Sequence, residues 1–510
     1  MLKEYEYDQN EKNQIREETL KYIIGMLSDN RGQSACVREN YTRNLYNWIT
    51  TQDYDIKSKE ISNKISINYI DLWEDFHKSF VGIKRRSDLT VCYLSGPQPM
   101  NDFKVLVNNG IHPHNIWAFE VDKGTYKSAL QSIDASDFPM LKLHKGSIEQ
   151  FFLTTPKKFD IVYLDFCGAI PGSQHTTRII ASLFKYQRLN SPGALITNIA
   201  MPDITKEIEE DKYSDVISSY LSTKDYLEDE NGKIIENKLK DPLVFKAKVK
   251  GNFELFYSQF ITRQIMDIAT ITIPWSRLAS STLWSRYFNK SARDITIEKK
   301  RAKELSLSKS LENINMLKET SRNFGLKWID ELFGYPEPTS SSELINCYES
   351  LKSNSNHYTS NMIKIIDDFP YKDKMFQFCD KPSKNLVFDM LINQLSYPMH
   401  YNTRSIIRRQ YQAKKTKMFT DCFIFDEARY IYEWLPTIDL INNAFDNIPQ
   451  QLTYRFALDG LVKSRMYYNP EYFFSGSVVS VYDDDEFKAE VAGPRIQIGG
   501  EFDERDNFKA

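Results

Sequence analysis

Residues 90–201 alternate between short apolar runs and segments of helical periodicity, and this alternation limits the possible folds more than any other feature. The apolar runs are TVCYL, NIWAFEVD, LKLHK, FDIVYLD and ALITNI. Short buried strands that alternate with helices indicate parallel strands joined by right-handed crossovers, with both sheet faces covered. We therefore expect an α/β fold with a doubly wound, mostly parallel sheet. In such a sheet a ligand binds outside the carboxyl ends of the strands, where the strand order reverses.

The residues at the ends of the first four runs therefore form the candidate site. They are Ser95, Gly96 and Pro97; Glu120 and Val121; Gly146, Ser147 and Ile148; and Asp165, Phe166, Cys167 and Gly168. A carboxylate at the end of the second strand, here Glu120, offers paired acceptors for the two hydroxyls of a ribose.

Residues 88–203 resemble the class I S-adenosylmethionine-dependent methyltransferases at these strand ends. The resemblance implies that S-adenosylmethionine is the cofactor and that Gly96 passes its methionine part. It implies that Glu120 holds the ribose and Val121 lies by the adenine. It also assigns the adenine amine to Gly146, Ser147 and Ile148, and the reactive motif to Asp165, Phe166, Cys167 and Gly168. Family members commonly finish the sheet with an antiparallel hairpin, and ATITIPW (269–275) is a candidate strand for it.

The sequence also departs from the family pattern. The turn after the first strand has Gly96 alone, and Pro97 and Pro99 remove backbone donors from it. The fourth motif is not the Asp-Pro-Pro-Tyr type of amino-methylating DNA enzymes. It is closer to the Asp-Pro-Phe-Gly type of guanine-N2 tRNA methyltransferases, with which it shares Asp165 and Gly168.

Several candidate residues have a second interpretation. Glu120 could cap the next helix instead of binding a ligand, and Asp102 could cap its own helix or reach the cofactor. Asp165 could take a proton from a target amine or orient it. Cys167 could be a nucleophile or, as we prefer, a small apolar space-filler. Phe166 could stack on a flat base or close the core.

Composition is that of an ordinary soluble protein. The 510 residues suffice for two or three domains, and 41% of them are hydrophobic. The net charge of −3 gives no global attraction to nucleic acid. The six cysteines have neither metal-ligand nor redox spacing, so we expect no metal site and free thiols in a reducing cytoplasm. No signal segment or bilayer-spanning apolar run is evident, so we expect no membrane association.

The chain divides into four expected parts. Residues 1–89 form an N-terminal helical region, and residues 90–290 form a Rossmann-like methyltransferase domain. That domain has a charged insertion near 222–242, where Asn-Gly signals a turn. Residues 291–314 form a polar linker. Residues 315–510 form a mainly helical C-terminal domain that ends in a hairpin and a frayed tail.

Residues 404–417, RSIIRRQYQAKKTK, carry the main basic cluster. On a helix, Arg404 and Arg408 would share a face, as would Tyr411 and Lys415. A positive face with an aromatic residue suits a phosphate backbone, and the alternative is a solvated helix balanced by acids elsewhere. The candidate nucleic-acid residues are Arg404, Arg408, Arg409, Lys414, Lys415 and Lys417.

These features lead to two main hypotheses of different classes. The first is an S-adenosylmethionine-dependent methyltransferase that acts on nucleic acid. The second is a catalytically degenerate methyltransferase-like scaffold in a multi-protein complex, in which exposed aromatic residues would anchor other subunits. A nucleotide-binding fold for a different ligand is a third, because the position of Glu120 alone does not distinguish them.

Overall fold

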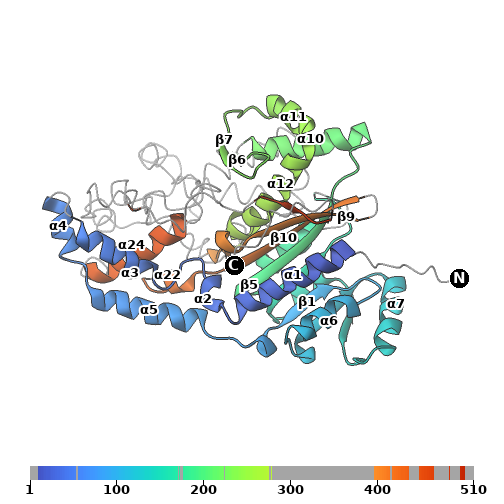
Figure 1. The fold of residues 1–510 in the computed structure, drawn as a ribbon, viewed down its shortest axis with the longest axis horizontal. Coiled ribbons are helices and arrows are strands. Elements are labelled where there is room, and N and C mark those ends of the chain that lie inside the picture. Colours follow the sequence, from blue (N-terminus) through green and yellow to red (C-terminus); the bar gives the residue numbers. More distant parts are fainter. Residues whose placement is uncertain are drawn as a thin grey trace, which may run out of the picture.

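A mixed sheet of nine described strands lies at the centre of the computed structural model, with helices on both faces (Figure 1). The structure describes residues 10–52, 56–170, 172, 176–222, 224, 226–274, 277, 396–413, 416–435, 447–463, 482 and 494–499.

The parallel part of the sheet consists of five strands in the order β3-β2-β1-β4-β5. They are β1 (Val91–Leu94), β2 (Ile116–Glu120), β3 (Lys142–Lys145), β4 (Phe159–Asp165) and β5 (Leu189–Ala200). These strands coincide with the five predicted apolar runs, and the α/β prediction is confirmed. The strand order reverses between β1 and β4, so their carboxyl ends mark the switch point at which such sheets bind ligands.

An antiparallel hairpin completes the sheet beyond β5. β10 (Thr416–Asp426) pairs antiparallel with β5, and β9 (Ile407–Ala413) pairs antiparallel with β10. The prediction that residues 269–275 supply one of these strands is wrong. Residues Ile268–Thr272 instead form a π-helical turn that continues α12 (Phe253–Asp267), because Ile268 and Ala269 are buried in the core beside that helix.

The basic segment 404–417 is therefore not a helix, and this prediction is corrected. Residues Thr403–Ser405 form a 3-10 turn, and Ile407 onward is strand β9. Pairing with β10 satisfies the backbone of this segment. Residues 400–426 thus extend the central sheet and do not belong to a separate helical domain. Two-residue strands, β8 (His400–Tyr401) and β11 (Ile496–Gln497), add to β10 and β9.

Helices cover the two faces of the sheet. On one face lie α1 (Asn10–Leu27), α6 (Met100–Asn108) and α7 (Lys123–Asp134), packed on a common core cluster. On the other face lie α8 (Ile148–Thr154), α9 (Thr176–Lys185) and α12. Successive side chains of β1 point to opposite faces of the sheet and so contribute to both cores. Tyr93 faces α1, and Cys92 faces the opposite side.

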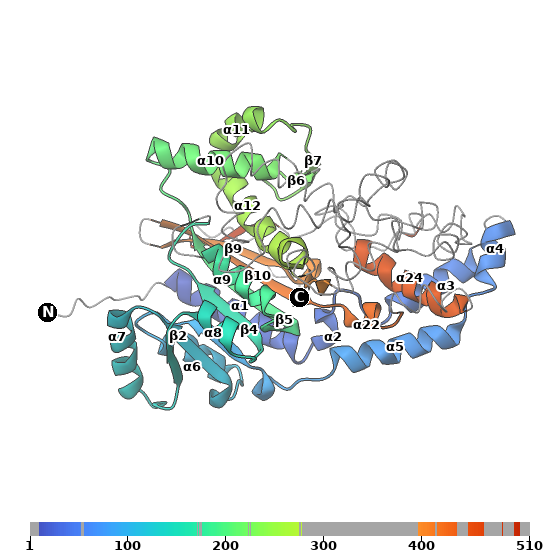
Figure 2. The same cartoon turned by 180° about the vertical axis from the view of Figure 1, so that it is seen from behind.

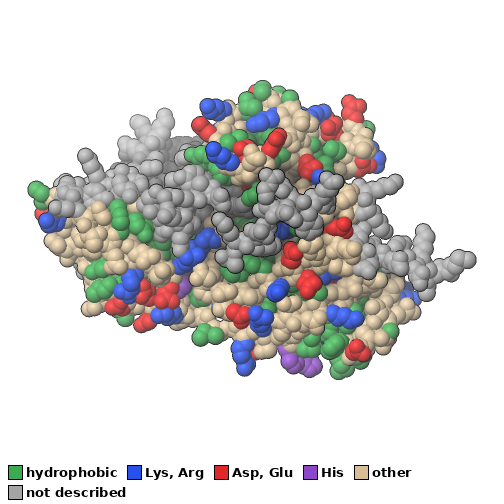
Figure 3. Space-filling model, in the orientation of Figure 1, with side chains coloured by type: hydrophobic (Ala, Val, Ile, Leu, Met, Phe, Trp, Pro, Cys, Tyr) green, Lys and Arg blue, Asp and Glu red, His purple; other side chains and the backbone are tan. Residues whose placement is uncertain are grey.

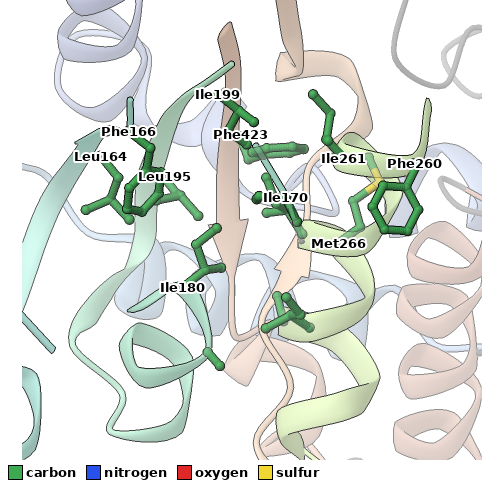
Figure 4. Packing of buried hydrophobic residues seen from close by; sticks show 14 of the residues in the cluster. Leu164, Phe166, Ile170, Ile180, Leu195, Ile199, Phe260, Ile261, Met266 and Phe423 are labelled. Carbon is green, nitrogen blue, oxygen red and sulfur yellow. The ribbon is translucent and has the colours of Figure 1, made fainter. Parts of the chain in front are cut away.

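The core on the α12 side is rich in aliphatic and aromatic side chains (Figure 4). Leu164, Leu195 and Phe423 project from the strands, and Phe260, Ile261 and Met266 project from α12. These contacts hold α12 against the sheet.

A helical part lies beyond one end of the sheet (Figure 1). It contains α3 (Tyr41–Thr51), α5 (Ile67–Val81), α22 (Arg429–Tyr432) and α24 (Ile448–Lys463). The indole N–H of Trp73 donates to the carbonyl oxygen of Tyr430 at 3.0 Å, which ties α5 to α22. Within the predicted N-terminal helical region lie α1, α3 and α5, with short α2 (Arg31–Ser34) and α4 (Ile56–Ser62) between them.

A small lobe stands on the other side of α12 from the parallel strands (Figure 2). It contains α10 (Glu207–Leu221), β6 (Tyr226–Glu228), β7 (Ile234–Glu236) and α11 (Pro242–Gly251). The predicted insertion near 222–242 is the β6–β7 hairpin. Its turn lies at the predicted Asn-Gly pair, where the Gly232 N–H donates to the Asp229 carbonyl at 3.0 Å.

Some predictions fall on parts of the chain that the structure does not describe. These are the linker (291–314), helices expected in 315–395, the terminal hairpin near 475–491 and the tail after residue 499. Among the described helices, none has the length and apolar character needed to cross a bilayer.

Candidate functional site

The carboxyl ends of β1 to β4 bring the predicted site residues to one edge of the sheet. After β1, Gly96 has a φ of +56°, a conformation that favours glycine. No atom lies within 4 Å of the position that a Cβ would take there, so the turn faces open space. The Ser95 N–H donates to the Phe119 carbonyl at 3.0 Å, which joins this turn to the end of β2.

Glu120 ends β2 with one carboxylate oxygen unused. Its Oε1 accepts the backbone N–H of Asp122 at 2.8 Å, and its Oε2 has no hydrogen-bond partner among the described residues. Asp122 is the N-cap of α7 and accepts the Thr125 N–H at 2.8 Å, so Glu120 contributes to the start of this helix only through the Asp122 N–H. Val121 follows with 69% of its surface exposed. An available acceptor beside an exposed apolar side chain is suited to a ribose and its attached base.

The end of β3 adds a second glycine turn. Gly146 has a φ of +153°, and its N–H donates to the Glu120 carbonyl at 3.0 Å. Ser147 stands at the N-cap of α8 without a side-chain hydrogen bond to the helix. The Ile148 side chain is buried in the core, so only its backbone faces this edge. A hydroxyl and backbone amides at a helix N-terminus are hydrogen-bonding groups suited to a base edge.

Asp165 ends β4 and is held from two sides. Its Oδ2 lies 2.7 Å from the ammonium of Lys12, and its Oδ1 accepts from the Asn198 amide at 2.7 Å. Burial lowers the pKa of Lys12, but the charge and hydrogen bond of Asp165, together with Tyr411, outweigh burial and the net shift of the pKa is upward. Lys12 therefore keeps its positive charge next to the candidate reactive motif.

Asn198 connects Asp165 to the added hairpin. Its Nδ2 also lies 2.8 Å from the Tyr411 hydroxyl of β9, and its Oδ1 accepts from the Thr420 hydroxyl of β10 at 3.1 Å. The network spans four neighbouring strands, which fixes the orientation of the Asn198 amide and with it Asp165.

Sequence reasoning missed Lys12, Asn198 and Tyr411. Asn198 could have been suspected, because it is a polar residue inside the apolar run ALITNI. Lys12 and Tyr411 carry no local signal, since α1 and β9 reach this edge only in the folded chain.

A second ion pair lies beside the first turn of α6. Arg16 Nε donates to Asp102 Oδ1 at 2.6 Å, and both side chains are buried. Burial raises the pKa of Asp102, an effect that Arg16 opposes. No side-chain cap is formed at the start of α6, so the capping interpretation of Asp102 is wrong. Asp102 is thus bound to Arg16 of α1, which lies four residues after Lys12 in the same helix.

The rest of the fourth motif is divided between core and surface. Phe166 is 5% exposed in the core cluster, so it closes the core and does not offer a base-stacking face. Cys167 is exposed, so its space-filling interpretation is wrong. Partial desolvation and the charge of Asp165 raise its thiol pKa, which disfavours a nucleophilic thiolate. The Gly168 carbonyl accepts the Ala200 N–H at 3.1 Å and fixes the loop to β5.

The predicted nucleic-acid residues do not form a free basic face. Arg408 is 2% exposed, and its guanidinium forms an ion pair with Glu228 at 2.5 Å. Arg409 is also buried, Arg404 donates to the Ala35 carbonyl at 3.1 Å, and Lys417 binds Glu254 at 2.6 Å. Lys414 and Lys415 lie outside the described residues. The acid-balanced alternative therefore fits this segment, although on strands.

No metal site is formed by the described residues, in which no group of three or more histidine, cysteine, aspartate or glutamate side chains is placed to bind an ion. His112 and His114, which the sequence places two apart, stack on each other with 5.1 Å between ring centroids.

No family model and no curated protein matches this chain. Among solved structures, the chain is similar to the crystal structure of an S-adenosylmethionine-dependent methyltransferase from Clostridium acetobutylicum ATCC 824. The similarity covers 36% of this chain and 68% of that chain, at 17% sequence identity and a TM-score of 0.18. At this level the likeness carries no argument about function, which has to come from the residues of this chain.

Proposed function

We propose that this protein binds S-adenosylmethionine at the carboxyl ends of β1, β2 and β3 and transfers its methyl group to an acceptor near Asp165. The free Oε2 of Glu120 beside the open Gly96 turn is the observation that supports this most directly. A carboxylate that ends a parallel strand next to the switch point can bind both hydroxyls of a ribose.

Each cofactor contact follows from the position of a strand end. Glu120 accepts from the ribose, and Val121 packs on the adenine. Gly146, Ser147 and Ile148 present a hydroxyl and backbone amides to the adenine edge. The methionine part of the cofactor lies along the turn formed by Ser95, Gly96 and Pro97. Asp102 contributes to cofactor binding only by positioning Arg16, to which its carboxylate is already bound.

The reaction needs little acid–base chemistry from the protein. S-adenosylmethionine carries a sulfonium methyl group, and the protein has to align an acceptor with it and exclude water. Both oxygens of Asp165 already have partners, so the residue orients an acceptor N–H through its remaining lone pairs. With its thiol protonated, Cys167 shapes the site, together with Gly168, and does not attack the substrate.

The test is calorimetric titration of S-adenosylmethionine into the wild type and Glu120→Ala. We expect Glu120→Ala to weaken binding by about 1–3 kcal/mol, the size of a hydrogen bond to a charged group. Asp122→Asn is the matched control, because it removes a carboxylate two residues away and keeps an N-cap residue. Equal loss in both variants, or no binding by the wild type, would refute the proposed site.

The alternative is a methyltransferase-like scaffold without catalysis. The engagement of Asp165 by Lys12 and Asn198 favours it, because both carboxylate oxygens already have a partner within the protein. Binding of S-adenosylmethionine without turnover on any nucleic acid, protein or small-molecule acceptor would support the scaffold.

A further inference from the structure

Two lysines lie over one tryptophan near the edge of the sheet. Lys142 Nζ is 3.9 Å and Lys157 Nζ is 4.7 Å from the centroid of a Trp117 ring. Lys142 also donates to the His114 carbonyl at 2.5 Å. Cation–π contacts and this hydrogen bond hold the two ammonium groups in place, where long lysine side chains would otherwise move freely.

Lys142, Lys157 and also Lys145, the last residue of β3, lack the acidic partners found elsewhere among the described residues. Among the described residues, no carboxylate lies within 4.0 Å of Lys142, Lys145 or Lys157. By contrast, Lys84 binds Asp160 at 2.6 Å and Arg85 binds Asp88 at 2.8 Å. Burial and the neighbouring charge of Lys157 lower the pKa of Lys142, as expected for cations held together without a counter-charge.

The surroundings add to the positive charge. Residues 140–158 contain four lysines and a single acidic residue, Glu149, which is bound to Arg178 at 2.8 Å. On the face shown in Figure 3, basic and acidic side chains are intermixed, in keeping with the net charge of −3. The concentration of unpaired lysines near β3 therefore needs an explanation other than the overall charge.

The position of β3 connects this surface to the proposed site. β3 pairs only with β2 in the described sheet and lies at the end that α7 covers (Figure 2). Lys145 is directly followed by Gly146 and Ser147 of the proposed cofactor site. Lys142 and Lys145 are three residues apart on this strand, roughly 10 Å, so their side chains lie on opposite faces of the sheet. Lys142 lies over Trp117 on one face and Lys145 lies 5.9 Å from the Tyr126 ring of α7 on the other, so the basic surface runs across the edge of the sheet at β3.

We propose that Trp117, Lys142, Lys145 and Lys157, the β3-edge surface, bind the phosphate backbone of a single-stranded nucleic acid that supplies the methyl acceptor. This rests on the proposed function and names its substrate class. A flexible single strand can follow the lysines to the carboxyl end of β3 and turn a base toward Asp165, which a stacked duplex cannot do without base flipping. A membrane surface fits less well, because membrane binding needs a larger apolar face to insert. Among residues 140–158, the large apolar side chains that are exposed are Met140 and Leu153.

The experiment is fluorescence anisotropy with a labelled 20-nucleotide single-stranded RNA at several salt concentrations. The test variant is Lys142→Gln/Lys145→Gln/Lys157→Gln. The control, Lys64→Gln/Lys212→Gln/Lys238→Gln, removes the same charge from three lysines, which lie in the turn after α4, in α10 and after β7. We expect the test variant to bind at least about tenfold more weakly, and its salt slope to fall by about 2, since each single-strand phosphate contact contributes roughly 0.7. The control should stay within about twofold of wild type.

Other outcomes separate the surface from the cofactor site. Replacing the same three lysines by arginine should preserve RNA binding, which excludes misfolding as the cause of loss. Equal RNA binding by the test and control variants would overturn the proposal. The proposal would also be overturned if the wild type bound phosphatidylserine vesicles or polyglutamate but did not bind RNA. Intact S-adenosylmethionine binding in such a case would leave the proposed function standing. Lysine-dependent RNA binding without cofactor binding would refute the proposed function, and of the further proposal only the RNA-binding surface would remain.

Discussion

Asp165 is the most constrained residue of the candidate site. Lys12 and Asn198 occupy one carboxylate oxygen each, at 2.7 Å in both cases. Asn198 is fixed in turn by Thr420 and Tyr411. A carboxylate held this way keeps a set position and charge, so its contribution to methyl transfer is geometric, and precise placement can supply a large part of a rate enhancement.

Tyr411 provides a pH test of this network. Burial, and then the charge of Asp165, raise the pKa of Tyr411 from 10.0 to about 12. The folded state thus prefers the neutral phenol. The stability from this preference is fully present below the unfolded pKa of 10.0 and is lost as the pH rises toward about 12.

We therefore expect Tyr411→Phe, which cannot ionise, to lose less stability than the wild type between these pH values. The difference should approach roughly 2–3 kcal/mol, as a two-unit shift requires. Urea unfolding at a series of pH values measures it. Other buried tyrosines titrate in both proteins and cancel in the difference. Parallel stability curves for the two proteins would show that Tyr411 is not buried in this network.

At the scale of elements, the sequence predicted those that form from local patterns. The five parallel strands and α1, α3 and α5 follow from apolar periodicity, and so do Gly96 and Glu120 at the strand ends. Strand β9 was mistaken for a helix, because its arginines have helical spacing and its partners lie elsewhere in the chain. Arg408 is buried only because Glu228, 180 residues earlier, neutralises it. Likewise, the β-branched run ATITI is helical because α12 continues into the core.

Helix packing gives a prediction in which two identical substitutions have opposite signs. Gly460 lies inside α24, where a Cβ would come 2.7 Å from the Tyr41 ring of α3. Tyr41 is buried and its hydroxyl binds Asp459, so the ring cannot move aside. Gly460→Ala should therefore destabilise the protein by about 1–3 kcal/mol through overpacking.

Gly25 is the matched control in α1, since nothing lies within 4 Å of its would-be Cβ. Gly25→Ala should stabilise the protein by up to about 1 kcal/mol, because alanine has the higher helix propensity. Thermal unfolding of both variants compares them directly. Stabilisation by Gly460→Ala would contradict the close packing of α24 on α3.

At the scale of the whole molecule, the N-terminal and C-terminal regions fold against each other and around the sheet. Arg404 and Asn402 donate to the Ala35 carbonyl, and Trp73 donates to the Tyr430 carbonyl. The division into an N-terminal region, a central domain and a separate C-terminal domain stays a prediction, but the described residues of 396–435 pair with the sheet and bind the N-terminal region. Composition alone could not reveal this, because the contacts join residues more than 350 positions apart.

Asp426 lies where these regions meet and offers the clearest test of their cooperation. It is 2% exposed. One carboxylate oxygen accepts the Cys36 N–H at 2.9 Å and the Tyr430 hydroxyl at 2.7 Å. The other accepts the Ser191 hydroxyl and the Ala428 N–H, each at 2.9 Å. One side chain thus joins the segment after α2, strand β5 and helix α22.

Asp426→Ala leaves four donors without their acceptor, and we expect it to cost about 3 kcal/mol or more of unfolding free energy. Asp203→Ala is the control, because within the described part of the chain that exposed carboxylate binds only its neighbours Thr205 and Lys206 and should contribute less than about 1 kcal/mol. Urea unfolding followed by tryptophan fluorescence and by circular dichroism measures both. If the regions form one cooperative unit, the two signals shift together in Asp426→Ala. Different shifts in the two signals would mean that the regions do not unfold as one unit.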